Sequence, residues 1–344
     1  MANFNELTIS NDAVTCANVL YTQGEQQYGN LIVAEVIAKR MFLVALAMGD
    51  GNPLLAGEPG GGKSSLVEYA TRIIQGIDED KVVFVPHRAD LTAAQLVGDS
   101  ARSIKTVQDS EGRESREVIT AELEPLISPD TQAVTFDEVT RLNPYALNAA
   151  LGILAQRKIT RDGKSIKMDK LQLIASAMNP GEKLSTSFKL GDAFASRQTL
   201  GAILGAGSEA ERDMIQTELW KNRWQPTPDE VQPVISLSQL HMIRDSIPKV
   251  TLNDKLVEEG MQIAKNTRDR LRDPTVTDRP VKEADGRITT NLIRITRTLA
   301  LLRGRTGADS EDLHDAVSYT VTGRLALRGS DATEIAKVVS AIYS

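Results

Sequence analysis

Residues 57–64 are Gly57-Glu58-Pro59-Gly60-Gly61-Gly62-Lys63-Ser64, which matches the pattern G-x-x-x-x-G-K-[ST]. The apolar run 52–56 predicts a short strand before this stretch, and residues 63–75 after it are typical of a helix. A glycine-rich turn in this position lets backbone N–H groups surround phosphate oxygens at the positive end of a helix. The sequence therefore predicts a phosphate-binding loop, with Lys63 on the β- and γ-phosphate oxygens and the Ser64 hydroxyl on Mg²⁺. The candidate nucleotide-binding residues are Gly57, Glu58, Pro59, Gly60, Gly61, Gly62, Lys63, Ser64 and Ser65.

Short apolar runs separated by helical patterns predict an α/β fold around a parallel sheet covered on both faces. The five expected strands are residues 52–56, 81–86, 133–136, 171–177 and 199–204, and an amphipathic helix is expected over residues 33–48. Asp162-Gly163 predicts a type I′ hairpin over residues 159–166, and residues 103–120 predict a second hairpin. The expected organisation is an arm (1–25), an α/β core (26–205), a linker (206–232) and a helical domain (233–344).

Two acidic residues, Asp137 and Glu138, directly follow the apolar strand 133–136. In a parallel sheet, ligands bind at the carboxyl ends of the strands, so Asp137 is expected to support Mg²⁺ there. Glu138 is then the candidate that polarises an attacking water molecule. Two acids after an apolar run are more often the solvated end of a strand, but the phosphate-binding loop upstream favours the chemical role.

Asn179 follows the strand 171–177 and precedes Pro180. A polar amide at this position can hold the attacking water or the γ-phosphate, as glutamine does in GTPases. Asn-Pro is also a turn signal, so a purely conformational role stays open for Asn179 at this point.

The composition is that of a globular chain. Its 344 residues are 41% hydrophobic and 25% charged, which suits about two domains and excludes collagen and wholesale disorder. The net charge of −6 offers no large cationic surface to nucleic acid, and the aromatic content of 4% argues against recognition by base stacking. A weaker or local interaction with nucleic acid stays open.

No part of the sequence indicates secretion or membrane insertion. The first residues, MANFNELTISND, lack the basic and apolar regions of a signal peptide. The most apolar stretch, residues 31–48, is interrupted by Glu35, Lys39 and Arg40, so it is not expected to span a membrane. Cys16 is the single cysteine, which excludes an intrachain disulfide. We therefore expect a soluble cytoplasmic protein.

The order of these motifs resembles the AAA+ ATPases, and among them the MoxR family, which is close to the gas-vesicle and the Rubisco- or nitric-oxide-reductase-activating ATPases. The resemblance covers residues 29–327. Residues 90–98 are similar to the loop before the family's helix-2 insert, and residues 137–144 match its DE-x-x-R-x-x-P motif. The hairpin at residues 162–163 looks like the pre-sensor-1 hairpin, and residues 301–313 look like the lid's final helices. The resemblance implies a P-loop AAA+ core with a parallel five-stranded sheet, followed by an all-helical lid.

The resemblance also implies roles for two arginines. Arg197 is similar to the arginine finger that enters the active site of a neighbouring subunit, although Gln198 stands where the family usually has Phe. Arg141 or Arg161 is the fallback finger. Arg287 falls at the sensor-2 position, although Asp285 and Gly286 replace the usual small-Pro flank. The alternative for both arginines is a solvated surface charge.

Residues 157–170 concentrate positive charge around the first hairpin. This range contains six basic and two acidic residues, which gives a net charge of +4. The basic residues are Arg157, Lys158, Arg161, Lys164, Lys167 and Lys170. Such a run is usually the solvated face of a hairpin. The alternative is a pore-facing hairpin that touches an acidic partner or nucleic acid.

The resemblance implies a Mg²⁺-dependent ATP hydrolase that works as a homo-hexameric ring. Its work would be chaperone-like: to remodel, activate or mature a partner protein, which by family analogy carries a von Willebrand factor A domain. The alternative function is a DNA-stimulated AAA+ translocase that uses the basic hairpin 157–170. A phosphotransferase would share only the P-loop, and the set of Asp137, Glu138, Asn179 and Arg197 opposes it.

Overall fold

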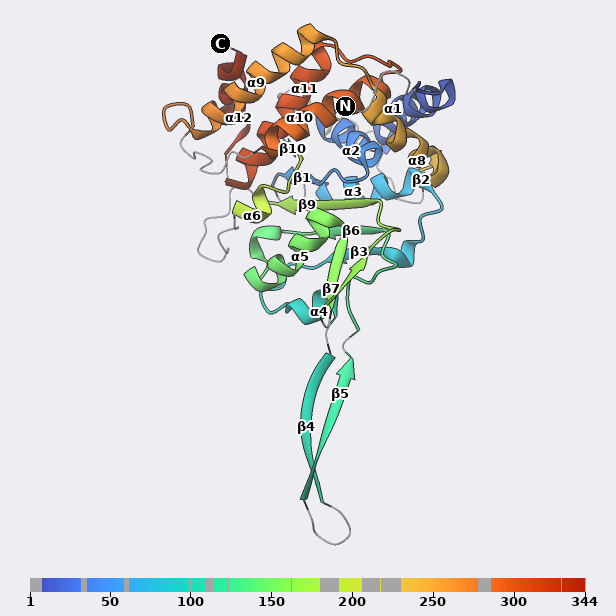
Figure 1. Cartoon of the computed structure of the whole chain (residues 1–344), viewed down its shortest axis with the longest axis vertical. Coiled ribbons are helices and arrows are strands. Elements are labelled where there is room, and N and C mark those ends of the chain that lie inside the picture. The colour runs from blue at the N-terminus through green and yellow to red at the C-terminus, as the bar shows by residue number, and fades with distance from the viewer. Residues whose placement is uncertain are drawn as a thin grey trace, which may run out of the picture.

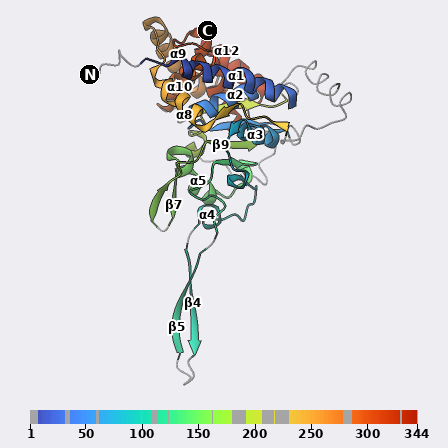
Figure 2. The same cartoon turned by 90° about the vertical axis from the view of Figure 1, so that its right-hand side faces the viewer.

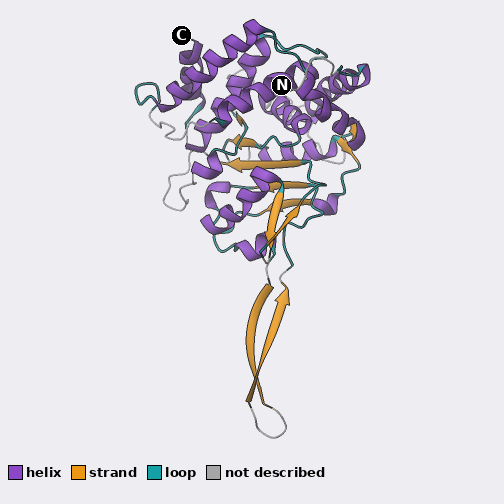
Figure 3. Cartoon of the chain, viewed as in Figure 1, coloured by secondary structure: helices purple, strands orange, loops and turns teal. Residues whose placement is uncertain are grey.

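A five-stranded parallel sheet lies at the centre of the chain, as predicted (Figures 1 and 3). The computed structural model describes residues 8–31, 36–58, 62–98, 100–108, 114–122, 124–161, 163–179, 192–205, 217, 230–277, 286–328 and 330–343. The strands stand in the order β10-β1-β9-β6-β3, and every adjacent pair is parallel. Their bounds are β1 Pro53–Ala56, β3 Val82–Val85, β6 Ala133–Phe136, β9 Leu173–Met178 and β10 Leu200–Ile203.

The core helices connect and cover these strands. They are α2 Val36–Met48, α3 Lys63–Arg72, α4 Ala93–Val97, α5 Pro144–Gln156 and α6 Asp192–Ala195, with short 3-10 segments at Glu79–Lys81 and Val139–Arg141. Helix α2 is buried on all sides along most of its length, which suits its nearly continuous apolar sequence. Its 13 residues are too few to span a bilayer, and no other described helix is long and apolar enough to do so.

The segment that we expected to be an N-terminal arm is largely a helix. Helix α1, Asn11–Leu31, packs against α2 and against helices of the C-terminal region. Its buried positions are Ala13, Ala17, Leu20, Tyr21 and Tyr28, which recur at helical spacing. Because this stripe consists of small and aromatic residues with few aliphatic ones, the segment has the composition of a polar arm while carrying the pattern of a helix.

Two antiparallel hairpins leave the core, as predicted. Strands β4 Ser100–Gln108 and β5 Glu114–Glu122 form a long ribbon that points away from the rest of the molecule in both views (Figures 1 and 2). Strands β7 Lys158–Arg161 and β8 Lys164–Lys167 form the shorter hairpin beside α5. Gly163 adopts φ 72° in its turn, as a type I′ turn requires, and Asp162 lies outside the described residues.

The described part of the C-terminal region, residues 230–277, 286–328 and 330–343, is mainly helical, with one small strand. Its helices are α8 Leu237–Ser246, α9 Asp254–Arg272, α10 Arg287–Leu302, α11 Ser310–Leu325 and α12 Ala332–Tyr343, with 3-10 segments at Ile247–Lys249 and Ala326–Arg328. Before α8, the strand β11 Ile235–Ser236 pairs with β2 Ile74–Gln75, a contact that the sequence pattern did not indicate. We call helices α8 to α12 the lid; its α11 covers β10 at the edge of the sheet, and α10 packs against α11 and α2 (Figure 1).

Two glycines allow the lid to approach the sheet closely. A Cβ atom on Gly201, in β10, would collide with the backbone N and Cα of Gly323, in α11. A Cβ atom on Gly323 would lie 3.0 Å from the carbonyl carbon of Leu200. The backbones of β10 and α11 therefore touch here without side chains between them. This contact holds the lid against the amino-terminal half of β10.

We expect Gly201→Ala to lower the free energy of unfolding by about 1–3 kcal/mol, the usual cost of forcing extra atoms into a packed interior. Gly260→Ala is the matched control. Gly260 lies within helix α9, and a Cβ atom there would meet only Leu313 Cδ2, at 3.9 Å. That change should stabilise the protein by up to about 1 kcal/mol. Urea denaturation of the two variants checks the prediction, and equal effects would contradict the close approach.

Candidate functional site

The candidate site lies along one edge of the sheet, because the strands are parallel and their carboxyl ends coincide. Gly57 follows β1, Asn179 follows β9, Asp137 follows β6, and His87 lies two residues beyond β3. These four strands are adjacent in the order β1-β9-β6-β3. This carboxyl edge therefore brings together residues that are up to about 120 positions apart in the sequence, as expected for ligand sites in open parallel sheets.

The loop after β1 has the backbone that its glycines allow. The Gly57 N–H donates to the Met178 carbonyl (3.1 Å), and a Cβ at Gly57 would lie 2.9 Å from Leu204 Cβ. Gly62 adopts φ 77° as the residue that caps helix α3, a conformation that favours glycine. Ser64 is exposed and Ser65 is half-buried in the first turn of this helix, whereas Pro59, Gly60 and Gly61 lie outside the described residues.

The Lys63 side chain turns back into the loop that precedes it. It is buried, and its ammonium donates to the carbonyls of Gly57 and Glu58 and to Oδ1 of Asn179, each at 2.8 Å. These contacts match the three N–H donors of an ammonium group. Three oxygen atoms thus hold the positive charge of Lys63 at the N-terminal end of α3. Phosphate oxygens can replace them.

Asn179 joins the lysine to the acidic residues. While its Oδ1 accepts from Lys63, its Nδ2 donates to Oε1 of Glu138 at 3.1 Å. Glu138 adopts φ 40°, in the left-handed region that few residues other than glycine occupy, so its backbone carries strain at this position. The Asn179 amide therefore has polar partners on both sides, Lys63 and Glu138, besides its place at the end of β9.

Asp137 is partly exposed at the carboxyl edge. Its Oδ1 accepts from the Glu138 N–H (3.1 Å), and its side chain is 33% exposed at the carboxyl edge. No group of three or more His, Cys, Asp or Glu side chains within the described residues could hold a metal on its own. Mg²⁺ is commonly bound by one or two carboxylates together with substrate phosphates and water, so a carboxylate and the Ser64 hydroxyl fit that donor set.

Two further residues contact the acidic pair. Arg141 Nη1 lies 2.8 Å from Glu138 Oε2, and His87 lies 3.7 Å from Asp137 Oδ2 and 3.8 Å from Glu138 Oε2. The sequence analysis did not select His87 as a site residue. Its position directly after the strand 81–86 was the signal that could have identified it. Arg141 was considered as the arginine finger in case Arg197 is not. In the structure it pairs with the carboxylate of Glu138 in the same chain.

Arg197 lies at the opposite edge of the sheet, the amino edge. It precedes β10, and its carbonyl accepts from Nδ2 of Asn52, the residue before β1, at 2.8 Å. Asn52 and Gly57 are separated by strand β1, so the two edges are about 16 Å apart at about 3.3 Å per residue. The Arg197 backbone is thus on the far side of the sheet from the loop that holds Lys63.

Arg287, at the start of α10, lies beside Arg197. Its Nη1 donates to Ser196 Oγ at 2.5 Å. A second lid residue, Arg324, is buried and donates to the Ala195 carbonyl at 3.4 Å. The two sequence-derived arginine candidates therefore share the amino edge, and lid side chains hold the segment that carries Arg197.

The basic residues of the shorter hairpin divide into two groups. Arg157 turns into the protein: its Nη1 donates to Asn52 Oδ1 (2.8 Å), and burial lowers its pKa to about 10. Lys170 pairs with Asp130 at 2.6 Å. Lys164 and Lys167 are exposed, so the hairpin offers less free positive charge than its composition indicates.

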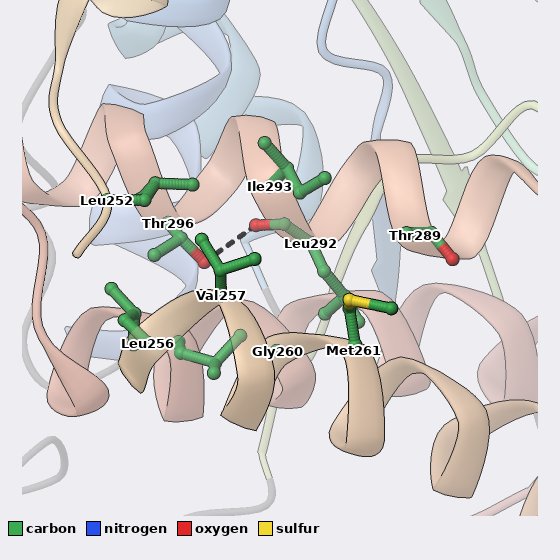
Figure 4. A pocket seen from close by; sticks show the side chains of 10 residues that line it. Leu252, Leu256, Val257, Gly260, Met261, Thr289, Leu292, Ile293 and Thr296 are labelled. Carbon is green, nitrogen blue, oxygen red and sulfur yellow. Dashed lines mark hydrogen bonds between the residues drawn. The ribbon is translucent and has the colours of Figure 1, made fainter. Parts of the chain in front are cut away.

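A separate hollow of about 80 Å³ lies in the lid between α9 and α10 (Figure 4). Its lining includes Leu256, Met261, Leu292 and Ile293, and none of the lining residues is titratable. The hydroxyl of Thr296 donates to the Leu292 carbonyl at 2.6 Å within the helix. Such a surface cannot hold phosphate, so it is distinct from the candidate site.

Comparison with known proteins agrees with this geometry. Residues 52–197 match the family described as "AAA domain (dynein-related subfamily)". The chain is 25% identical over 300 residues to Chaperone MoxR1 of Mycobacterium tuberculosis, covering 86% of this chain and 73% of that one. It is 23% identical over 285 residues to the uncharacterized protein YeaC of Bacillus subtilis, covering 83% and 80%.

A crystal structure from Cytophaga hutchinsonii has the same fold, with a TM-score of 0.64 at 18% identity and coverage of 90% of this chain and 87% of that one. The matched domain spans the loop with Lys63, the acidic pair and Arg197, and the similarity to the two relatives and the solved structure extends beyond this domain. Residues 52–197 are therefore an AAA domain, and the chain is similar over most of its length to a chaperone of the MoxR type.

Proposed function

We propose that this protein hydrolyses ATP in a ring of identical subunits, and that it uses the energy to remodel, activate or mature a partner protein. The observation that carries the proposal is the separation of the site into two edges. Lys63, Asn179 and Glu138 form a continuous polar chain at the carboxyl edge, whereas Arg197 lies beyond the amino edge. A complete site requires the carboxyl edge of one subunit and the amino edge of the next.

The carboxyl edge supports binding and water activation. Lys63 would exchange its carbonyl and amide partners for the β- and γ-phosphate oxygens, beside the positive end of α3. Asn179, freed from Lys63, would hold the attacking water against Glu138, which accepts the proton. Ser64 and Asp137 would hold Mg²⁺, which neutralises charge on the phosphates when it is bound.

The amino edge supports a contribution to the neighbouring subunit. An arginine side chain is much shorter than the sheet is wide at β1, so Arg197 cannot reach the phosphates of its own chain. A head-to-tail arrangement would place this edge against the next carboxyl edge, and such contacts form a ring where the rotation between subunits closes. Arg287 is held beside Arg197, so we propose that it acts at the same interface, and a hexamer is the expected stoichiometry.

The proposed partner is another protein. The Mycobacterium tuberculosis relative is called a chaperone, which supports work on another protein, in our proposal one with a von Willebrand factor A domain in the cytoplasm. The DNA-translocase alternative depended on the basic hairpin. Because Arg157 is directed inward and Lys170 is paired, the described residues of the hairpin do not favour that alternative.

Lys63→Ala should weaken ATP binding by about 10- to 100-fold, since a charge-assisted contact is worth about 1.5–3 kcal/mol. Isothermal titration calorimetry measures the affinity directly. Lys164→Ala is the matched control, because Lys164 is an exposed lysine on the shorter hairpin. Unchanged affinity in Lys63→Ala would show that ATP does not bind at this loop.

Glu138→Gln should bind ATP normally and hydrolyse it about 10²–10⁴-fold more slowly, because the amide keeps the size of the side chain and removes the base. Phosphate release under single-turnover conditions separates this loss from any change in binding. Glu258→Gln, at an exposed position of α9, controls for the loss of one negative charge. Turnover close to that of the unmodified protein would exclude Glu138 as the base.

Arg197→Ala should lower hydrolysis by about 10³-fold or more, the scale of arginine fingers, with ATP affinity unchanged. The defect should act between subunits. In a head-to-tail ring assembled from equal amounts of Arg197→Ala and Glu138→Gln, about one interface in four pairs an intact Glu138 with an intact Arg197, so activity should return. A mixture that stays inactive, or full activity in a dilute monomer, would contradict the ring mechanism.

A further inference from the structure

Asn52 occupies a junction at the amino edge of the sheet. It is only 3% exposed, and it stands directly before β1, at the point where the α2–β1 loop enters the sheet. Its Nδ2 donates to the carbonyls of Leu154 (3.0 Å) and Arg197 (2.8 Å), and its Oδ1 accepts from Arg157 (2.8 Å). Both donors and the acceptor of one buried amide are thus used to join three separate segments.

Arg157 brings the shorter hairpin into this junction. It caps the end of α5 with φ 52° and directly precedes β7, so the left-handed turn that starts the hairpin also directs the side chain inward. Besides Asn52, its guanidinium contacts the Gly49 carbonyl at 3.2 Å. Its pKa of about 10 is lowered mainly by burial, so it remains a cation near neutral pH and needs these oxygen partners.

The Asn52 contact with Arg197 is not needed to attach β10. Backbone pairing already joins β10 to β1, and α11 covers β10 through the approach of Gly201 to Gly323. What the amide adds is a fixed position for the Arg197 backbone, whose side chain is half-buried and donates through Nη1 to the Ala193 carbonyl at 2.6 Å. A side chain that acts across an interface depends on such positioning, since an error of about 1 Å can cost about 100-fold in rate.

We propose that Asn52 is a positioning residue for Arg197, and that Arg157 links this position to the β7–β8 hairpin. The inference rests on the proposed role of Arg197 at the neighbouring site. A displacement of the hairpin would move the Arg157 guanidinium, the Asn52 amide and the Arg197 carbonyl together. The hairpin of one subunit would therefore influence hydrolysis in the next subunit.

Asn52→Asp tests the positioning role with little change in size. The carboxylate still accepts from Arg157, but an oxygen replaces Nδ2 opposite the carbonyls of Leu154 and Arg197, where it repels them. Hydrolysis should fall by about 10- to 100-fold with ATP affinity unchanged. Asn266→Asp is the matched control, since Asn266 also donates to a carbonyl, that of Ile342 (2.9 Å), and accepts from Gln262 (2.9 Å), within the lid.

Mixing experiments distinguish positioning from a general structural defect. Equal mixing of Asn52→Asp with Glu138→Gln should restore activity, because Glu138→Gln supplies an intact Arg197. Equal mixing with Arg197→Ala should not restore it, because neither variant supplies a well-placed arginine. A rate loss that Glu138→Gln fails to rescue would place the defect within the subunit and overturn the proposal, even where Asn52→Asp is also less stable to heat.

The link to the hairpin is tested by Arg157→Lys, which keeps the charge but cannot reproduce the guanidinium's contacts with both Asn52 and Gly49. The same defect, rescued by Glu138→Gln, is expected. Arg270→Lys is the control, because Arg270 donates to the Ala341 carbonyl in the lid at 2.9 Å. Normal hydrolysis in Asn52→Asp or Arg157→Lys, together with a loss in Arg197→Ala, overturns this inference alone, whereas normal hydrolysis in Arg197→Ala also overturns the proposed ring mechanism.

Discussion

The parallel pairing of β1 with β9 and β10 determines what each edge of this protein can carry. Because all three strands run in one direction, the loop with Lys63 and the amide of Asn179 must end on the same side. The segment with Arg197 enters β10 from the other side, where it meets Asn52. Reversing a single strand would place the lysine and the arginine on one edge, and the site would need no neighbour.

The lid belongs structurally to the amino edge. Gly201 and Gly323 bring β10 and α11 into backbone contact, and Arg324 holds the Ala195 carbonyl from the lid side. The same packing of the lid determines the position of Arg287, because it brings the start of α10 next to Ser196. In the proposed ring, Arg287 would therefore meet nucleotide at the neighbouring subunit's site, together with Arg197.

Much of the fold followed from local pattern. Each core strand is a short apolar run, and the phosphate-binding motif between a strand and a helix determined where the carboxyl edge lies. Helix α1 was missed because Ala17 and Tyr28 contribute to its buried face without the aliphatic residues that mark a core helix. The small pair β2–β11 was missed because two-residue strands carry no periodicity. His87 was missed because proximity to Glu138 arises from strand order, which the sequence does not display.

Arg157 shows why residue type and spacing were insufficient for the hairpin. By composition alone, Arg157 is one of six basic residues around a hairpin that we expected to be exposed. This count was the basis for the hypothesis that the hairpin contacts nucleic acid or an acidic partner. The left-handed backbone of Arg157 reverses the direction of the side chain, so the charge serves Asn52 and Gly49. A charge directed inward gives a hairpin little attraction for a polyanion, but it connects the hairpin mechanically to the sheet. That connection ends at the Arg197 carbonyl, which Asn52 contacts. Losing the charge of Arg157 would change the hairpin surface little, whereas losing its geometry would disturb the edge that we propose lies against the next subunit.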